Sequence, residues 1–150
     1  LIPQQKIASL AIDPDNVTVA VSQQFTSLVA VDLGGREING IDAVIHYDPS
    51  LLEVVESANG DLFENLLVNE VDSVNGIISI TASRISPDSQ PITINGVLAA
   101  ITFQALTQGE TTVEFVFDPT QTNTSNVTEA KTSDNILTTV SNATITITPQ

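Results

Sequence analysis

Residues 38–55 read INGIDAVIHYDPSLLEVV, and this stretch decides the fold class. Apolar and outward side chains alternate along the strand expected over 40–47, the apolar set being Ile41, Ala43 and Ile45 and the outward set Asp42, Val44 and His46. A period of two is typical of a β-strand with one buried face. Pro49 closes the strand because proline cannot donate to a sheet ladder. The stretch therefore predicts a strand, a turn and a second strand over 52–55.

Similar short segments recur along the whole chain, separated by turns rich in Gly, Pro, Asn and Asp. Nine strands are expected, over residues 17–22, 28–33, 40–47, 52–55, 68–74, 76–83, 96–105, 111–117 and 143–148. No long helical period competes with them, although Asp61 is placed to cap one short helical turn over 61–67. Residues 118–134 have few apolar anchors and form the longest irregular connection. The pattern predicts one all-β sandwich domain over residues 1–150.

The formal net charge is −14, because 18 acidic residues face only four basic ones. Such a charge repels phosphate backbones and anionic membrane surfaces, which excludes nucleic acid as a partner, whereas it attracts a basic patch on another protein. The absence of Cys excludes disulfides and thiolate metal sites. No apolar run approaches the roughly 20 residues of a membrane span. Residues 1–5 lack the pattern of a signal peptide, so we expect an excised mature domain.

Five motifs occur in an order that covers nearly the whole chain: the stretch 38–55, a Gly-Asp-Leu-Phe at 60–63, an Asn-Gly-Ile-Ile at 75–78, and the segments 95–103 and 142–147. Together they resemble the cohesin family, the nine-stranded jelly-roll modules of cellulosomal scaffoldins and of related bacterial and archaeal surface proteins. None of these motifs is catalytic. The resemblance implies a jelly-roll sandwich in a secreted or cell-surface prokaryotic protein.

The resemblance also implies a partner, dockerin, which is a small helical module that depends on calcium. Dockerin would bind the sheet formed by the strands at 111–117, 40–47, 76–83 and 68–74. The contact residues carried over by position are Asp42, Val44, His46, Ser79, Thr81, Ser83, Arg84 and Glu114. One position departs from the family pattern, because better known members often have Asn where this chain has Gly40. The dockerin would carry the calcium, and no cofactor of this chain is implied.

The side chains that could take part in catalysis are one His and several carboxylates, and their arrangement does not indicate an enzyme. His46 is the only imidazole, and without Cys or a second His it has no Ser-His or Cys-His arrangement in which to act as a base. Pairs of carboxylates occur at Asp13 and Asp15, Glu53 and Glu56, and Glu70 and Asp72. Turn formation and ordinary surface exposure explain these pairs more simply than a glycosidase site does. We therefore expect no enzyme, and we interpret His46 as a solvated strand residue or a contact whose charge changes near neutral pH.

The chain also contains residues of the types that bind calcium or carry sugars. Calcium ligands would come from Asp118, Asn123, Asn126 and Asp134, but the EF-hand spacing is absent and Asx turns are the simpler interpretation. Four Asn-x-Ser/Thr triplets begin at Asn16, Asn123, Asn126 and Asn142, which is compatible with glycosylation and no more.

Two functions besides dockerin binding stay open. Carbohydrate-binding modules share parts of the motif pattern, so polysaccharide is the alternative ligand. Such a module needs a planar strip of exposed aromatic rings, for which Tyr47 and five Phe are available and Trp is absent. The third function is purely structural, as one domain of a surface protein or adhesin.

Overall fold

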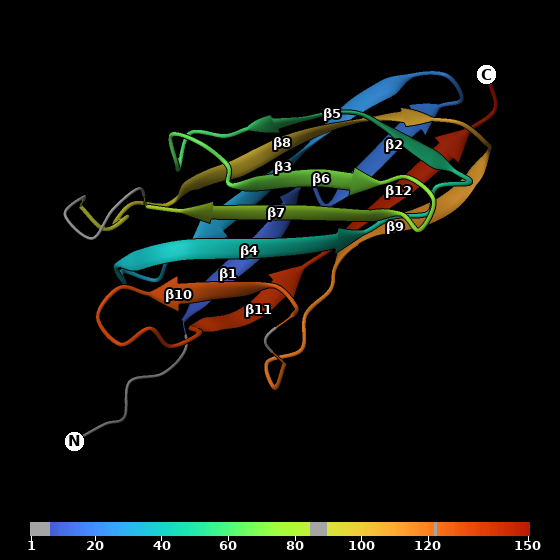
Figure 1. The fold of residues 1–150 in the computed structure, drawn as a ribbon. Helices are drawn as coiled ribbons and strands as arrows, with labels where there is room; N and C mark the ends of the chain where they lie inside the picture. The colour runs from blue at the N-terminus through green and yellow to red at the C-terminus, as the bar shows by residue number, and fades with distance from the viewer. Residues whose placement is uncertain (1–6, 85–89, 122) are drawn as a thin grey trace.

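The computed structural model describes residues 7–84, 90–121 and 123–150, which form twelve strands and no helix. The first sheet has the order β11-β1-β3-β8-β5 and contains β1 (Ala8–Asp13), β3 (Gln24–Asp32), β5 (Leu52–Asn59), β8 (Gly96–Ala105) and β11 (Leu137–Ser141). The second has the order β2-β12-β9-β4-β7-β6, with β10 beside β4, and contains β2 (Asn16–Ala20), β4 (Ile38–His46), β6 (Val68–Asp72), β7 (Ile77–Ser83), β9 (Gly109–Phe115), β10 (Asn126–Glu129) and β12 (Ala143–Thr148) (Figure 1).

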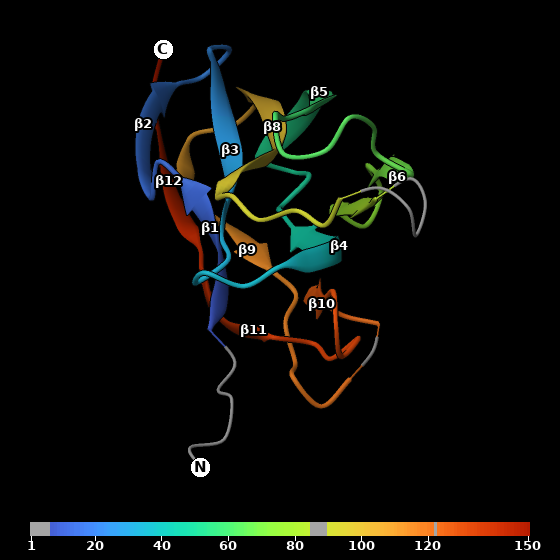
Figure 2. The same ribbon diagram turned by 90° about the vertical axis from the view of Figure 1, so that its left-hand side faces the viewer.

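The two sheets pack face to face and enclose an aliphatic core. In Figure 2 the layer with β4, β6 and β10 lies to the right of the layer with β1 and β3. Strand β4 shows how alternation builds the core, because Ile41, Ala43 and Ile45 are at most 2 % exposed while their neighbours are not buried. The ring of Phe103 on β8 contacts Tyr47 edge-on at 5.7 Å between centroids and stacks on Phe25 at 5.4 Å. These rings supply the only aromatic pairs in the described part of the chain.

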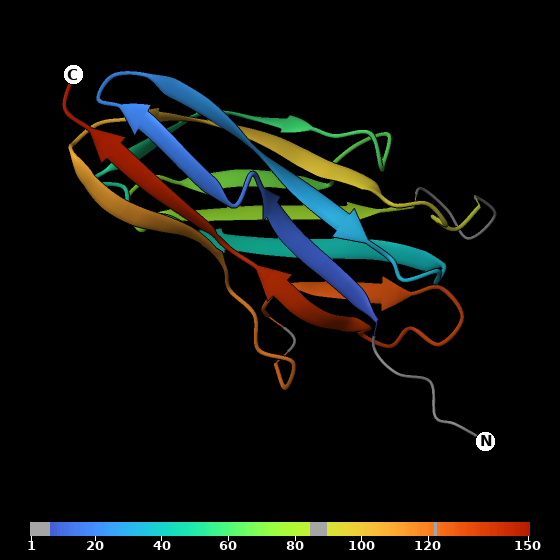
Figure 3. The same cartoon turned by 180° about the vertical axis from the view of Figure 1, so that it is seen from behind.

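The N-terminal strands are divided between the two sheets and lie against the C-terminal strands. β1 pairs in parallel with β11 in the first sheet, and β2 pairs in parallel with β12 in the second (Figure 3). The chain passes from one sheet to the other at Asp13 and Pro14, which are joined by a cis peptide bond. One edge of each sheet is therefore formed by two parallel strands from opposite ends of the chain.

The all-β sandwich expected from the sequence is confirmed, but the number of strands is twelve and not nine. The additional strands are β1, β10 and β11. β1 has the alternation of a strand, since Ala8, Leu10 and Ile12 are buried. β10 lies inside the span 118–134 that was expected to be irregular, where Val127 is its one fully buried apolar side chain. The sequence at 1–5 lies outside the described residues.

The helical turn expected over 61–67 is wrong. The Asp61 carboxylate accepts from the backbone N–H of Val97 at 2.8 Å, and the N–H groups of Asp61 and Leu62 donate to the Val97 carbonyl. These bonds tie the segment to the start of β8 and leave Asp61 no role as a helix cap. Leu62 and Phe63 are 6 % exposed each. Burial of these two side chains stabilises the segment in place of the hydrogen bonds of a helical turn. No helix among the described residues has the length and apolar character to cross a membrane.

Candidate functional site

The strands β9, β4, β7 and β6 are neighbours in that order, so the four segments named from the sequence form one continuous surface. We call the side of this surface that points away from the core the outer face; it is formed by Asp42, Val44, His46, Ser79, Thr81, Ser83 and Glu114. The register places Asp42 opposite Thr81 and Val44 opposite Ser79. Glu114 of β9 is opposite His46. The structure thus brings these residues together, and their role in binding stays a prediction.

Asp42 lies at the centre of a short hydrogen-bond network on the outer face. The hydroxyl of Thr81 donates to one carboxylate oxygen at 2.7 Å. The side-chain amide of Asn126, opposite Asp42 on β10, donates to the other oxygen at 2.9 Å. Both bonds come from neutral groups and fix the orientation of the carboxylate. Sequence reasoning placed Asn126 among possible calcium ligands and sugar sites, so its contact with Asp42 was missed.

An interruption between β9 and β10 lies directly beside Val44. The N–H of Val116 donates to the Val44 carbonyl at 2.7 Å, and the N–H of Ser125 donates to the Val116 carbonyl at 2.9 Å. The fully buried hydroxyl of Ser125 accepts from the Val44 N–H at 3.0 Å and donates to the Val44 carbonyl at 3.2 Å. The chain therefore leaves β4 and returns to it at one residue. We call residues 117–121 and 123–124, which lie between these contacts, the side loop.

The side loop and the outer face enclose a small open cavity of about 110 Å³, which we call the hollow. Its lining consists of Asp42, Ala43, Val44, Ser79, Ile80, Thr81, Asn123 and Thr124. Thr124 is 7 % exposed, and its hydroxyl accepts from the Asp118 N–H and donates to the Asp118 carbonyl, each at 3.1 Å. The wall that the loop contributes is therefore anchored. A cavity of this size has room for about one side chain of a partner, since an engineered cavity of about 150 Å³ holds one benzene molecule.

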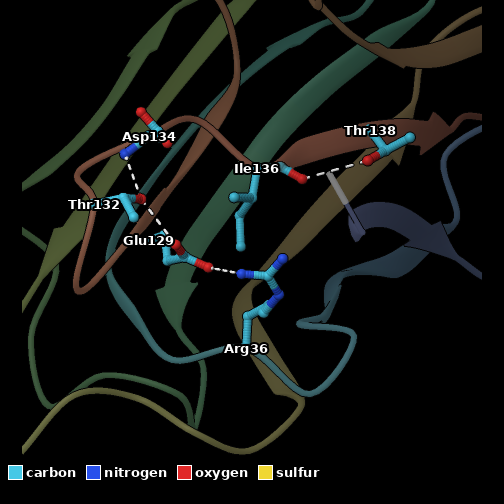
Figure 4. A network of polar contacts seen from close by, with 6 residues as sticks. All are labelled: Arg36, Glu129, Thr132, Asp134, Ile136 and Thr138. Atoms are coloured by element: carbon cyan, nitrogen blue, oxygen red, sulfur yellow. Dashed lines mark hydrogen bonds and ion pairs between the residues drawn. The ribbon is translucent and has the colours of Figure 1, made fainter. Parts of the chain in front are cut away.

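A second network fixes the far end of β10 (Figure 4). Glu129 forms an ion pair with Arg36, with side chains 11 % and 18 % exposed, and accepts from the Thr132 hydroxyl at 2.8 Å. The N–H of Ala130 donates to the Glu37 carbonyl at 2.9 Å. The contacts join β10 to the connection between β3 and β4. We call the Arg36–Glu129 pair the clamp, because it holds the strand that positions Asn126.

The position that departs from the family pattern has a steric explanation. Gly40 lies opposite Ser83, and a Cβ added to Gly40 would lie 2.8 Å from the carbonyl oxygen of Ala82. Any side chain there would require the β7 backbone to move. Arg84, just beyond β7, donates its N–H to the Asn39 carbonyl at 2.9 Å. This end of the outer face therefore presents backbone with no side chain at position 40.

The usual metal-binding side chains do not cluster in the described part of the chain. No three His, Cys, Asp or Glu side chains gather in a group that fits a metal within the described ranges. The Asp118 carboxylate, one suggested calcium ligand, accepts from the hydroxyl and the N–H of Thr120, which lowers its pKa from the ordinary value. Asn126, another, bonds to Asp42. The contacts of Asp118 are those of an Asx turn, whereas Asn126 lies in β10 and bonds across the sheet, so the interpretation as a turn residue is wrong for Asn126. Calcium binding stays a prediction.

Comparison with known proteins gives a family and a fold. The model of the family described as Cohesin domain matches residues 10–147. No curated protein sequence matches the chain. Similar solved structures include CaCohA2 of Clostridium acetobutylicum, with 23% identity and a TM-score of 0.77 over 97% of this chain and 93% of that one. The type I cohesin–dockerin complex Coh-OlpC-Doc435 of Clostridium thermocellum has 13% identity and a TM-score of 0.82, over 100% of this chain and 99% of that one. A non-cellulosomal cohesin of the archaeon Archaeoglobus fulgidus has 14% identity and a TM-score of 0.69, over 94% of this chain and 91% of that one.

Proposed function

The chain belongs to the cohesin domain family, and from that membership we propose that it is a non-catalytic module that binds a dockerin-type protein on the outer face. The observation that carries the proposal is the arrangement of this face. Strands β9, β4, β7 and β6 lie side by side, and their outward side chains make one continuous surface around Val44 and the oriented carboxylate of Asp42.

The chemistry of the face suits a helical partner. Val44 is partly exposed and supplies a small apolar centre, and around it lie the hydroxyls of Ser79 and Thr81 with the Asp42 carboxylate. Interfaces commonly have an apolar centre within a polar rim that forms hydrogen bonds. A helix with Ser, Thr, Lys or Arg side chains would find acceptors around that centre. The flat surface also lacks the deep cavity that a small-molecule site needs.

We further propose that the protein acts outside a prokaryotic cell, in the assembly of extracellular complexes, and that residues 1–150 form one binding domain. Family membership supports the location, since cohesins are modules of scaffoldins and related surface proteins. A chain without Cys and with a net charge of −14 is compatible with such an environment. Calcium would enter the complex with the dockerin, and the chain itself would need no cofactor.

The carbohydrate-binding alternative lacks its platform. All six aromatic residues lie in the described part of the chain, four of them buried and two, Phe25 and Phe117, half-buried. Tyr47 and Phe103 are in the core at 1 % and 0 % exposure. A planar strip for stacking on sugar rings is therefore missing. The purely structural role makes a different prediction, namely that no dockerin binds.

The test is calorimetric titration of the protein with calcium-loaded dockerin modules encoded in the same genome. We expect at least one module to bind with a Kd of about 1 μM or tighter. Val44→Arg should weaken that binding at least about 100-fold, because a long charged side chain would occupy the centre of the interface. Thr26→Arg is the matched control, since Thr26 is exposed on β3 of the other sheet.

The outcomes separate the proposals. If Thr26→Arg abolishes binding and Val44→Arg does not, the partner binds the first sheet and our choice of the outer face is wrong. If none of the modules binds, dockerin recognition is refuted and the structural role gains support. Thermal melts of both variants establish that any loss of binding does not come from unfolding.

A further inference from the structure

We infer that the hollow is a subsite for one lysine side chain of the partner, with Asp42 as the residue that holds its ammonium group. The inference rests on the proposed function and specifies the chemistry of the partner at one point. It makes the side loop a determinant of partner choice, because the loop builds one wall of the subsite.

The state of the Asp42 carboxylate is the first argument. Each oxygen already accepts one hydrogen bond, from Thr81 and Asn126, so the group is held in one orientation. An ionised carboxylate has about four acceptor sites, which leaves capacity for further donors. Neither partner carries a charge: Thr81 donates a hydroxyl and Asn126 donates a side-chain amide. The negative charge of Asp42 is therefore oriented but not neutralised by a cation.

The lining of the hollow is the second argument. Val44 offers an apolar surface on which a methylene stem can pack, while Ser79 and Asn123 offer polar groups near the carboxylate. The lysine ammonium is compact and has three donors that can be shared between a carboxylate and nearby hydroxyls. Lysine suits the hollow better than arginine, because its compact ammonium needs less room than a planar guanidinium in a volume of about 110 Å³.

The surrounding charges also favour a cation. Glu70 and Asp72 on β6 face the same side as Ser79 and Ile77, and Glu114 on β9 lies opposite His46. The strands β9, β4, β7 and β6 contain no Lys or Arg, and Arg84 lies just beyond the end of β7. The net charge of −14 extends the same field over the whole protein. Such a field accelerates the approach of a basic surface, and Asp42 then fixes where it docks.

The side loop gives the subsite its position along the sheet. Thr124 and Asn123 stand beside β4 because Ser125 is bonded to both backbone groups of Val44. An uninterrupted strand beside β4 would continue the flat sheet at this point and leave no wall. The hollow therefore accepts a side chain at one place only, and a partner whose lysine lies elsewhere on its helix would be out of register.

A double-mutant cycle tests the inference on the dockerin module that binds most tightly in the titration described above. Each lysine of the module is replaced in turn by methionine, which keeps the length of the stem and removes the charge. Each variant is titrated against the parent chain and against Asp42→Asn. We expect one Lys→Met variant to bind the parent chain about 10- to 100-fold more weakly, and to bind Asp42→Asn within about 3-fold of the unmutated module.

A second pair of variants tests the hollow itself. Ser79→Leu fills the space that Ser79→Ala leaves open, so we expect Ser79→Leu to bind at least about 10-fold more weakly than Ser79→Ala. The same lysine should lose its coupling in the Ser79→Leu background. This arm remains informative if Asp42→Asn proves unstable in a thermal melt.

The inference is overturned if every Lys→Met variant binds the parent chain normally, or loses equal affinity for the parent chain and for Asp42→Asn. Coupling of Asp42 to a serine or threonine of the module in place of a lysine would also overturn it, since the hollow would then hold a hydroxyl. A failure of the proposed function looks different, because then no module binds the unmutated chain at all.

Discussion

Removing the clamp by Glu129→Ala should lower the free energy of unfolding by about 3 kcal/mol. Breaking a fully buried ion pair by deleting one partner costs about 3–5 kcal/mol, whereas exposed pairs contribute about 0–1 kcal/mol. Side-chain exposures of 11 % for Glu129 and 18 % for Arg36 place the clamp near the buried limit. Loss of the hydrogen bond from Thr132 is included in this value. Glu129→Gln keeps an acceptor for Thr132 and should cost about half as much.

Urea denaturation followed by circular dichroism measures the effect. With a slope of about 2 kcal/mol per M, a loss of 3 kcal/mol moves the unfolding midpoint down by about 1.5 M. Glu56→Ala is the control, because Glu56 is an exposed carboxylate on β5 and should shift the midpoint by less than about 0.3 M. If Glu129→Ala shifts it no more than the control does, the clamp contributes only as much as an exposed pair and our account of β10 is wrong.

Three further predictions concern turns and titrating groups. Gly76→Ala should lower the free energy of unfolding in urea by about 2–4 kcal/mol, because φ is +71° and the added Cβ would overlap the Tyr47 carbonyl. Gly35→Ala is the control and should lower it by only about 1 kcal/mol, since Gly35 has φ +82° but open space around it. The pKa values of Asp72 and Asp118 lie below the ordinary 3.8, so the stability they contribute is present above that pH and is lost as the pH falls through their folded pKa values. When both are replaced with Asn, the urea midpoint should therefore fall less on acidification than it does in the parent chain. Burial, and then the charges of Asp72 and Glu53, raises the pKa of Tyr47, the only tyrosine, above 10.0, so phenolate absorbance should appear at higher pH in the folded chain than in urea, and an ordinary titration would contradict its burial.

The outer face was largely predictable from the sequence, because strand parity depends only on a period of two. Ile41 and Ile45 have to be buried, and that requirement alone turns Asp42 and Val44 outward. The pairing of β6 with β7 followed from the hairpin at Asn75. The place of β4 beside β7 came from the family resemblance, because no turn connects these two strands. Local alternation and turn chemistry therefore give the faces of the strands and one edge of the second sheet.

The side loop and β10 were not predictable in this way. Asn126 lies in a strand of four residues whose position depends on pairing with β4 far away in the sequence. Ser125 completes the hydrogen bonding of Val44 with a hydroxyl, and a Thr- and Ser-rich span contains many equivalent candidates. The helical turn at Asp61 failed for the same reason, since its carboxylate bonds to Val97, which is distant in the chain. Contacts over such separations leave no local pattern.

The parallel pairing of the terminal strands has a mechanical consequence. β1 begins at one end of the sandwich and β12 ends at the other (Figure 3), so tension applied at Ala8 and Thr148 pulls the paired strands in opposite directions along their length. The bonds between β1 and β11, and between β2 and β12, are then loaded in shear and must break together, whereas strands peeled apart from one end lose their bonds one at a time. A domain connected in this way should resist stretching along the chain, which suits a module whose proposed task is to keep other proteins attached.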